Sequence, residues 1–471
     1  MSFKLGKAVN PDRVFITRRS DMASRLDPFF YIPSVVALEK RVGAAGAKPL
    51  RTFVRSIAGG ATPSKTDGGD YYTDEKQGVP FVRVQNLNTT SDLSLDDCIF
   101  ITRKTHDEML ARSQVVGGDL LIKITGVGRM AVASVAPDGF DGNINQHIVV
   151  CKTDDRKVSE ALAAYLNLDF VERLAYRRAT GGTRPALDYP ALLSIPVILD
   201  KHVPELSRKA NSAYLRMEAQ ARQLLASIDD LLMSELGIQL PPEPPATLAN
   251  RVFTRPFSEL TGRRFDPSSH SRNLDLTGGK FPALPLTKVA RLNPRTDFSH
   301  LEAAPISFVP MEAVSDDLGE ADCSATRPAD AAKSYTPFQE GDVISAKITP
   351  CMENGKAAVL RGLVGSYGYG STEYHVFRPD STRLNAEYLH ALLRLQTLRS
   401  HARLFFTGSA GHQRVSEEFF YRLQIPVPPL KTQERIVEKI AARRDEAKRL
   451  RAAAAAQLAA AKLEIEAMIL G

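Results

Sequence analysis

The sequence lacks the features of a membrane protein, a disulfide-linked fold or a zinc site. Its few cysteines are far apart, with no CxxC spacing, which argues against both a disulfide framework and a zinc site; they are Cys98, Cys151, Cys323 and Cys351. No apolar run reaches the length of a membrane span. The opening MSFKLGKAVNPDRVF is too polar for a signal peptide. We therefore expect a cytoplasmic protein that does not enter a membrane.

Signatures of a catalytic site are also scarce. Residues 126–131, GVGRMA, satisfy a GxGxxA dinucleotide pattern after an apolar strand, but that pattern needs a helix to follow it. The next residues, VASVAPDGFDG, favour a strand and then a turn, so we expect a hairpin instead. Residues 27–30, DPFF, lack the second proline of the signature typical of amino-group DNA methyltransferases, and we interpret them as a turn.

The composition is that of an ordinary globular protein. The chain has 471 residues, of which 43% are hydrophobic and 24% are charged, enough for two or three domains with their own cores. The formal net charge of +7 fits a polyanionic partner such as nucleic acid. Spread over so long a chain, the same excess also fits an ordinary surface.

One stretch of the sequence occurs twice. ATGGTRPALDYPALLSIPVIL in the first half matches SAGHQRVSEEFFYRLQIPVPPL in the second. A single numbering offset aligns Gly181 with Gly411 and Arg184 with Arg414. Repeats this far apart indicate duplicated domains.

The duplication extends upstream of these loops. GDLLIKIT from Gly118 matches GDVISAKIT from Gly341, whose extra residue we interpret as a β-bulge. NQHIVV corresponds to EYHVF, so His147 and His375 are expected at equivalent strand positions as structural histidines. Both halves therefore contain a β-rich body, a late helix and a glycine-arginine loop.

Each copy then runs into a long helix, from about Pro204 to Leu236 and from about Gln433 to Leu470. Apolar residues recur at gaps of three and four, which gives each helix one apolar stripe. At about 1.5 Å per residue the helices would be roughly 50 and 57 Å long, more than a small domain needs. We expect them to pack antiparallel against each other and to hold two globular domains apart. The alternative, that each lies on its own domain, fits the alanine run Ala452–Ala456 less well.

These patterns predict an α+β fold with two repeated β-rich domains separated by two long antiparallel helices. The predicted boundaries are residues 1–202 for the first β-rich domain, 203–237 for the first long helix, 238–250 for a Pro-rich linker, 251–430 for the second β-rich domain and 431–471 for the second long helix.

This arrangement resembles the specificity (S) subunit of type I restriction-modification systems over essentially the whole chain. The resemblance is carried by the two GD-strand motifs, the two G-x-x-R loops and IPVPPLKTQERIV, which leads into a long helix. The first copy, IPVILDKHVPELSR, departs from the pattern because it lacks the Pro-Pro pair and the Gln.

The resemblance implies a non-catalytic protein with two target-recognition domains. Each would read one half of a split, asymmetric site in double-stranded DNA, with the helices as a ruler. Two methyltransferase subunits would dock on the helices, and a translocating restriction subunit would join them. S-adenosylmethionine, ATP and Mg²⁺ would bind to these partners, and no cofactor or metal to this chain. The alternatives are a single-chain methyltransferase or nuclease with fused recognition domains, and a scaffold that binds only protein.

The candidate DNA-binding residues lie in the glycine-arginine loops and beside the hairpins that follow the GD strands. Glycines let the backbone approach DNA, while Arg, Lys and Gln side chains contact base edges or phosphates. For each one alone, a solvated surface charge is the alternative. The candidates are Lys123, Arg129, Thr183 and Arg184 in the first half, and Lys347, Lys356, His412, Gln413 and Arg414 in the second, with the two lysines there as rough equivalents of Lys123 and Arg129. The candidate partner-binding residues on the helical stripes are Leu224, Ile228, Leu231, Ile436, Ile440 and Leu450.

Overall fold

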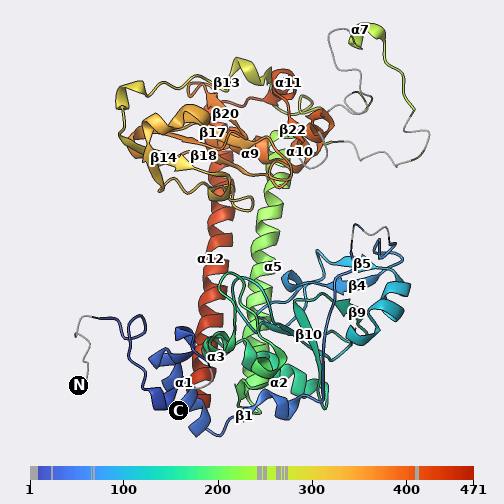
Figure 1. Cartoon of the computed structure of the whole chain (residues 1–471). Helices are drawn as coiled ribbons and strands as arrows, with labels where there is room; N and C mark the ends of the chain where they lie inside the picture. The colour runs from blue at the N-terminus through green and yellow to red at the C-terminus, as the bar shows by residue number, and fades with distance from the viewer. Residues whose placement is uncertain are drawn as a thin grey trace. The chain divides into compact units, whose positions relative to one another are not determined.

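The computed structural model divides the chain into two compact units (Figure 1). It describes residues 9–22, 25–64, 66, 69–240, 247, 252–260, 267, 270, 274–408 and 413–471. Unit 1 comprises residues 1–217 and 452–471, and unit 2 comprises residues 218–451. Within the described ranges, no helix combines the length and the apolarity that crossing a membrane requires. Most of the predicted Pro-rich linker lies outside the described residues.

Unit 1 is built on two sheets. The first is antiparallel, in the order β2 (Ser56–Gly59), β10 (Ile148–Lys152), β7 (Leu120–Lys123) and β8 (Ala133–Val135). The second has the order β3 (Tyr72–Thr73), β5 (Ile99–Ile101), β4 (Val79–Val82), β9 (Asp141–Ile144) and β6 (Gln114–Val116). Its β4–β9 pair is parallel and its other pairs are antiparallel. A short ladder joins β1 (Lys48–Pro49) to β11 (Pro196–Val197).

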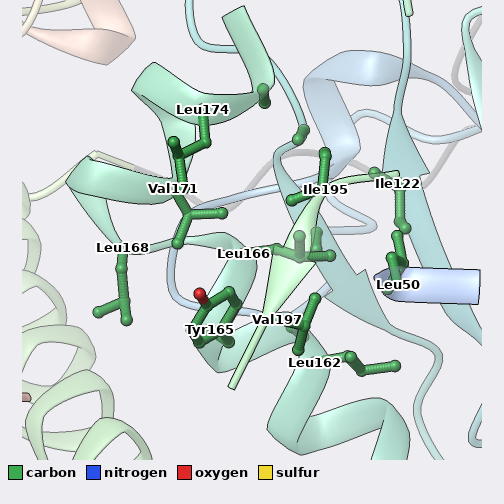
Figure 2. Close-up of a cluster of buried hydrophobic side chains, with 14 of the residues drawn as sticks. Leu50, Ile122, Leu162, Tyr165, Leu166, Leu168, Val171, Leu174, Ile195 and Val197 are labelled. Atoms are coloured by element: carbon green, nitrogen blue, oxygen red, sulfur yellow. The ribbon is translucent and has the colours of Figure 1, made fainter. Parts of the chain in front are cut away.

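Both faces of strand β7 are buried, which explains its unbroken apolar run. Successive side chains of a strand point to opposite faces. Leu120 and Ile122 belong to a core shared with the helices, whereas Leu121 belongs to a second core with Val150. Figure 2 shows part of the first core, where Tyr165 and its neighbours gather beside β11. The helices around this core are α1 (Pro33–Ala44), α2 (Arg156–Leu166), α3 (Asp169–Arg178) and α4 (Tyr189–Leu193).

Unit 2 repeats this plan. Its antiparallel sheet has the order β13 (Ala290–Leu292), β20 (Tyr374–Pro379), β17 (Val343–Ala346) and β18 (Ala357–Val359). Its mixed sheet has the order β15 (Thr326–Pro328), β14 (Pro305–Val309), β19 (Tyr367–Gly370) and β16 (Thr336–Gln339), with β14 and β19 parallel. Two short ladders pair β12 (Ala283–Pro285) with β23 (Gln424–Pro426) and β21 (Phe406–Thr407) with β22 (Arg414–Val415). Its short helices are α7 (Phe257–Leu260), α9 (Ala386–Arg394), α10 (Gln396–Ala402) and α11 (Glu417–Arg422).

The GD motif forms the same local structure in both units. Gly118 and Gly341 have φ values of +89° and +83°, a region that favours glycine. The following aspartates are buried, and each accepts a backbone N–H bond from the preceding strand, at 2.7 Å for Asp119 and 2.9 Å for Asp342. Each also forms an ion pair with a cation of the central strand, namely Lys152 in unit 1 and Arg378 in unit 2. The motif is therefore a structural element that fixes the start of β7 and β17.

The ladder register corrects three predictions made from the repeat. Strand β17 pairs with β20 without interruption from Val343 to Ala346, so the expected β-bulge is absent from this ladder. Ile148 faces Lys123 as Tyr374 faces Ala346. Lys123 is therefore equivalent to Ala346, and Lys347 to Ile124. By the same register the residue equivalent to His375 is Val149, and His147 corresponds to Glu373.

Two long helices are present as predicted, with α5 spanning Val203–Leu236 and α12 spanning Leu430–Leu470. Helix α12 begins earlier than expected because it starts directly after Pro428-Pro429. Thr432 lies in its first turn and is not the cap. The buried Gln433 side chain binds the carbonyls of Pro428 and Arg383 and accepts a bond from Asn385 N. Gln433 thus ties the start of α12 to the start of α9.

Each long helix contributes to both units. In unit 2 the helices are antiparallel, because Glu235 pairs with Lys439 near one end while Glu218 pairs with Arg451 near the other. In unit 1, Ala210 of α5 and Ala461 of α12 line the same small cavity. The α+β class, the duplication and the antiparallel pairing of the helices are therefore confirmed. The five-segment division of the chain stays a prediction.

Candidate nucleic-acid interface

In both units the glycine-arginine loop lies beside the hairpin that follows the GD strand. Leu187 N donates to Ile124 O at 2.8 Å in unit 1, and Val415 N donates to Lys347 O at 2.9 Å in unit 2. One residue further out, Gly126 N donates to Pro185 O at 3.2 Å. The matching bond in unit 2 joins Thr349 N to Gln413 O at 2.9 Å. In each unit, adjacent backbone bonds therefore join these two segments of the chain.

These bonds correct the alignment of the two arginines. Thr125 bridges Ala186 in unit 1, as Ile348 bridges Arg414 in unit 2. Arg414 is therefore equivalent to Ala186, and not to Arg184. The offset fails here because ten positions separate Ala186 from Pro196 (196 − 186 = 10), whereas twelve separate Arg414 from the equivalent Pro426 (426 − 414 = 12). His412 lies outside the described residues.

Lys123 and Arg129 hold the β7–β8 hairpin and do not face open solvent. The Lys123 ammonium donates to Val127 O at 2.8 Å, and burial lowers the pKa of Lys123. Arg129 donates to Asn167 O at 2.7 Å and forms an ion pair with Asp169, also at 2.7 Å. The residues after GVG form no helix, and β7 and β8 pair antiparallel. The prediction of a hairpin is therefore confirmed.

Thr183 and Arg184 are exposed at the tip of the unit 1 loop. Gly181 precedes them with a φ of +92°, so the chain turns sharply outward there. Within the described ranges, the Arg184 guanidinium has neither an ion pair nor a side-chain hydrogen bond. Arg184 is thus a cation that a polyanion can reach without breaking an existing contact.

Arg414 in unit 2 is instead held by Glu373. Its Nε donates to Glu373 Oε2 at 2.8 Å and its second terminal nitrogen to Oε1 at 2.7 Å, a bidentate pair. The hydrogen bond from Arg414 lowers the pKa of Glu373, and Lys347 adds to the effect. Lys356 is used internally, because its ammonium donates to Met311 O at 3.0 Å. Gln413 is half-buried next to Arg414.

Glu373 was not among the residues predicted from the sequence. Its only signal was its own acidic side chain, two positions before the histidine of EYHVF. His375 is buried, and its Nε2 lies 3.0 Å from Val415 O. A carbonyl accepts, so Nε2 carries the proton, and Nδ1 is left to accept from Asn293 at 3.3 Å. Burial lowers the pKa of His375. His375 is therefore a structural residue that ties β20 to β22, as expected.

The structure buries part of the predicted partner-binding set. Ile436 and Ile440 belong to the core of unit 2, with exposures of 0% and 3%, so neither offers surface to another chain. Their positions face the core because the apolar stripe of α12 packs against the body of unit 2. The half-buried members of the set are Leu224, Ile228, Leu231 and Leu450.

Comparison with known proteins finds a family model that matches part of unit 2. Residues 316–449 match the family model described as type I restriction modification DNA specificity domain. The chain is 42% identical over 153 residues to the type I restriction enzyme EcoAI specificity subunit of Escherichia coli, and 41% identical over 153 residues to the EcoEI specificity subunit of the same organism. Each alignment covers 32% of this chain but only 26% of the relative's length.

Solved structures give similarities of lower identity. A chain from a study of complex assembly and conformational transition of a type I R-M system is 17% identical, with a TM-score of 0.41, over 90% of this chain and 96% of that chain. The S subunit of a type I restriction-modification system from M. genitalium is 10% identical, with a TM-score of 0.36, over 90% of this chain and 94% of its own. The family match over residues 316–449 and the curated matches confirm the resemblance to type I specificity subunits.

Proposed function

We propose that this chain is the non-catalytic DNA specificity subunit of a type I restriction-modification complex. One observation carries the proposal: the segment that matches the DNA specificity domain lies in unit 2, and the antiparallel sheet of unit 1 repeats the strand order and ladder register of its counterpart in unit 2. A chain with two such bodies is suited to a bipartite site. Each unit would read one half of a split, asymmetric sequence in double-stranded DNA.

We propose that the paired loops of each unit face the DNA. Arg184 supports this in unit 1, because it is exposed and no described residue neutralises it. In unit 2 the support comes from Lys347, Gln413 and Arg414, which adjacent backbone bonds bring together. An arginine oriented by a carboxylate can present a fixed donor to a base, whereas a mobile exposed arginine suits a phosphate. We therefore assign base reading to Arg414 and phosphate contact to Arg184.

The proposed partners are two methyltransferase subunits and the restriction subunits that join them. They would bind S-adenosylmethionine, ATP and Mg²⁺, and this chain would bind none of these. We place methyltransferase docking on the long helices. Leu215 of α5 and Leu463 of α12 are 40% and 67% exposed, so they offer apolar surface to a partner, unlike the buried Ile436 and Ile440. They replace Ile436 and Ile440 as the docking candidates.

The test is selection of binding sites from a random duplex library. The chain would be co-expressed with its methyltransferase subunit, and the bound duplexes would be sequenced. We expect a split motif with two fixed halves and an unspecified spacer. An unsplit motif, or no sequence preference, would overturn the proposal of two recognition bodies. Incubating the purified chain alone with labelled S-adenosylmethionine and the selected duplex should transfer no methyl group, and transfer would favour a single-chain methyltransferase.

A further inference from the structure

The β7–β8 hairpin of unit 1 carries an apolar side chain at its solvent-facing tip. Val127 is 77% exposed, more than nearly all other large apolar residues of the described chain. It stands between Gly126 and Gly128, whose φ values are +123° and +80°. These conformations strongly favour glycine, so the backbone is specifically shaped to turn Val127 outward.

Three contacts hold this tip in place. Lys123 donates to the carbonyl of Val127 itself, at 2.8 Å. Arg129 anchors the far side through Asn167 O, and Gly126 N anchors the near side through Pro185 O. A single exposed apolar residue is ordinary on a protein surface. The lysine behind it is not ordinary. Lys123 has only 5% of its surface exposed and still holds the carbonyl of this exposed residue, although burying an ammonium costs free energy.

The position of the tip relates it to the surface proposed to face DNA. Pro185, which anchors Gly126, directly follows the exposed Arg184. Unit 2 differs at this point, because the equivalent loop, residues 349–356, buries Met352. The exposed valine is thus a feature of one unit. A residue that reads one half of an asymmetric site must likewise differ between the two units.

We propose that Val127 is a specificity-determining residue that contacts the 5-methyl group of a thymine in the first half-site. This inference rests on the proposed function and names a contact within it. Valine offers no hydrogen bond, so the thymine methyl is the feature of the major groove that it can read. Its side chain is short compared with the Phe, Leu, Ile or Met that insert between base pairs as wedges. The clamped backbone fixes the side chain before DNA binds, which limits the entropy lost on binding.

The experiment replaces thymine by deoxyuridine, which lacks only the 5-methyl group. The complex of this chain with its methyltransferase would be titrated with selected-site duplexes in which each thymine of the first half-site is replaced in turn. We expect wild type to lose about fourfold in affinity at one position, the loss expected for one buried methyl group. Val127→Ala should lose a similar factor on the unmodified duplex and show no further loss with deoxyuridine at that position. Val364→Ala, at an exposed valine of unit 2, is the matched control and should behave like wild type.

Three outcomes would overturn the inference while the proposed function stands. In the first, Val127→Ala loses as much affinity as wild type at every deoxyuridine position. In the second, no deoxyuridine substitution changes the affinity of wild type. Loss of the methyltransferase from Val127→Ala during purification would also overturn it, because the loop would then be a protein contact. Failure of the proposed function is distinguishable, since wild type would then not discriminate the selected duplex from a random one.

Discussion

The cations beside the two hairpins fall into two groups by what their nitrogen atoms bind. Lys123, Arg129 and Lys356 donate to backbone carbonyls and so fix the loops. Arg184 is exposed, whereas Arg414 is oriented by a carboxylate. Residue type does not separate the two groups, because each contains arginine. Only the distance from each nitrogen to its acceptor separates a loop anchor from a cation available to DNA.

Glu373 should control how Arg414 meets DNA. Its negative charge neutralises Arg414 and repels phosphates, so Glu373→Gln should strengthen binding to non-specific duplex DNA. The dependence of log affinity on log salt concentration should steepen by about one, the change expected for one additional phosphate contact. The selected motif should lose discrimination at one position of the second half-site, because Arg414 is no longer held in one orientation. Salt titrations and motif selection on the complex measure both effects.

The control for Glu373→Gln is Glu418→Gln. Glu418 forms an ion pair with Arg422 on the surface of α11, so its loss changes the net charge by the same amount. It should alter neither the salt dependence nor the motif by a comparable amount. Equal effects of the two substitutions would show that net charge, and not the orientation of Arg414, is responsible.

Among the secondary-structure elements, one tyrosine bond occurs in both units. The hydroxyl of Tyr165 on α2 donates to Pro196 O of β11 at 3.0 Å, and that of Tyr388 on α9 donates to Pro426 O of β23 at 2.9 Å. Burial raises the pKa of both tyrosines, so both hydroxyls stay protonated and donate at neutral pH. This bond connects the late helix of each unit to the strand that precedes its long helix.

Removing either hydroxyl should loosen only its own unit. Tyr165→Phe leaves a part-buried carbonyl without its donor, and Tyr388→Phe leaves a buried one. Each should lower the free energy of unfolding, by about 1 kcal/mol for the first and about 1–3 kcal/mol for the second. Hydrogen exchange followed by mass spectrometry should show faster exchange around β11 for the first variant and around β23 for the second. Each variant is the control for the other. Equal acceleration in both units would contradict the assignment of these bonds to two separately stabilised cores.

The sequence could predict these elements better than their register. The apolar stripes and turn residues were sufficient for the two long helices and for the hairpin after GVG. They were not sufficient to equate Arg414 with Ala186 or Lys347 with Ile124, because the loops differ in length between the repeats. A shift of one residue leaves apolar alternation detectable but moves every side chain to the opposite face. Only the inter-strand hydrogen bonds decide between such alignments.

For the whole molecule, the last residues of the chain stabilise the unit formed by the first. Ile465 and Ile469 near the end of α12 are 2% and 8% exposed and belong to the core of unit 1. Lys462 lies 3.4 Å from Asp169 of α3 in the same unit. The apolar stripe indicated which face of α12 is buried. It could not indicate that the stripe packs on unit 2 in its first half and on unit 1 in its second, because periodicity carries no information about the partner.

Ile465→Ala should therefore destabilise the N-terminal unit although it lies near the C-terminus. The cavity left by a buried isoleucine costs about 2–5 kcal/mol, and hydrogen exchange should accelerate in residues 120–123 and 148–152 while unit 2 is unchanged. Met468→Ala, at a 41% exposed position three residues away on the same helix, is the control and should change stability by about 0.5 kcal/mol or less. If unit 1 of this variant unfolds at a lower temperature than unit 2, motif selection at rising temperature should lose the first half of the motif and keep the second. Simultaneous loss of both halves would mean that the two units unfold as one cooperative body.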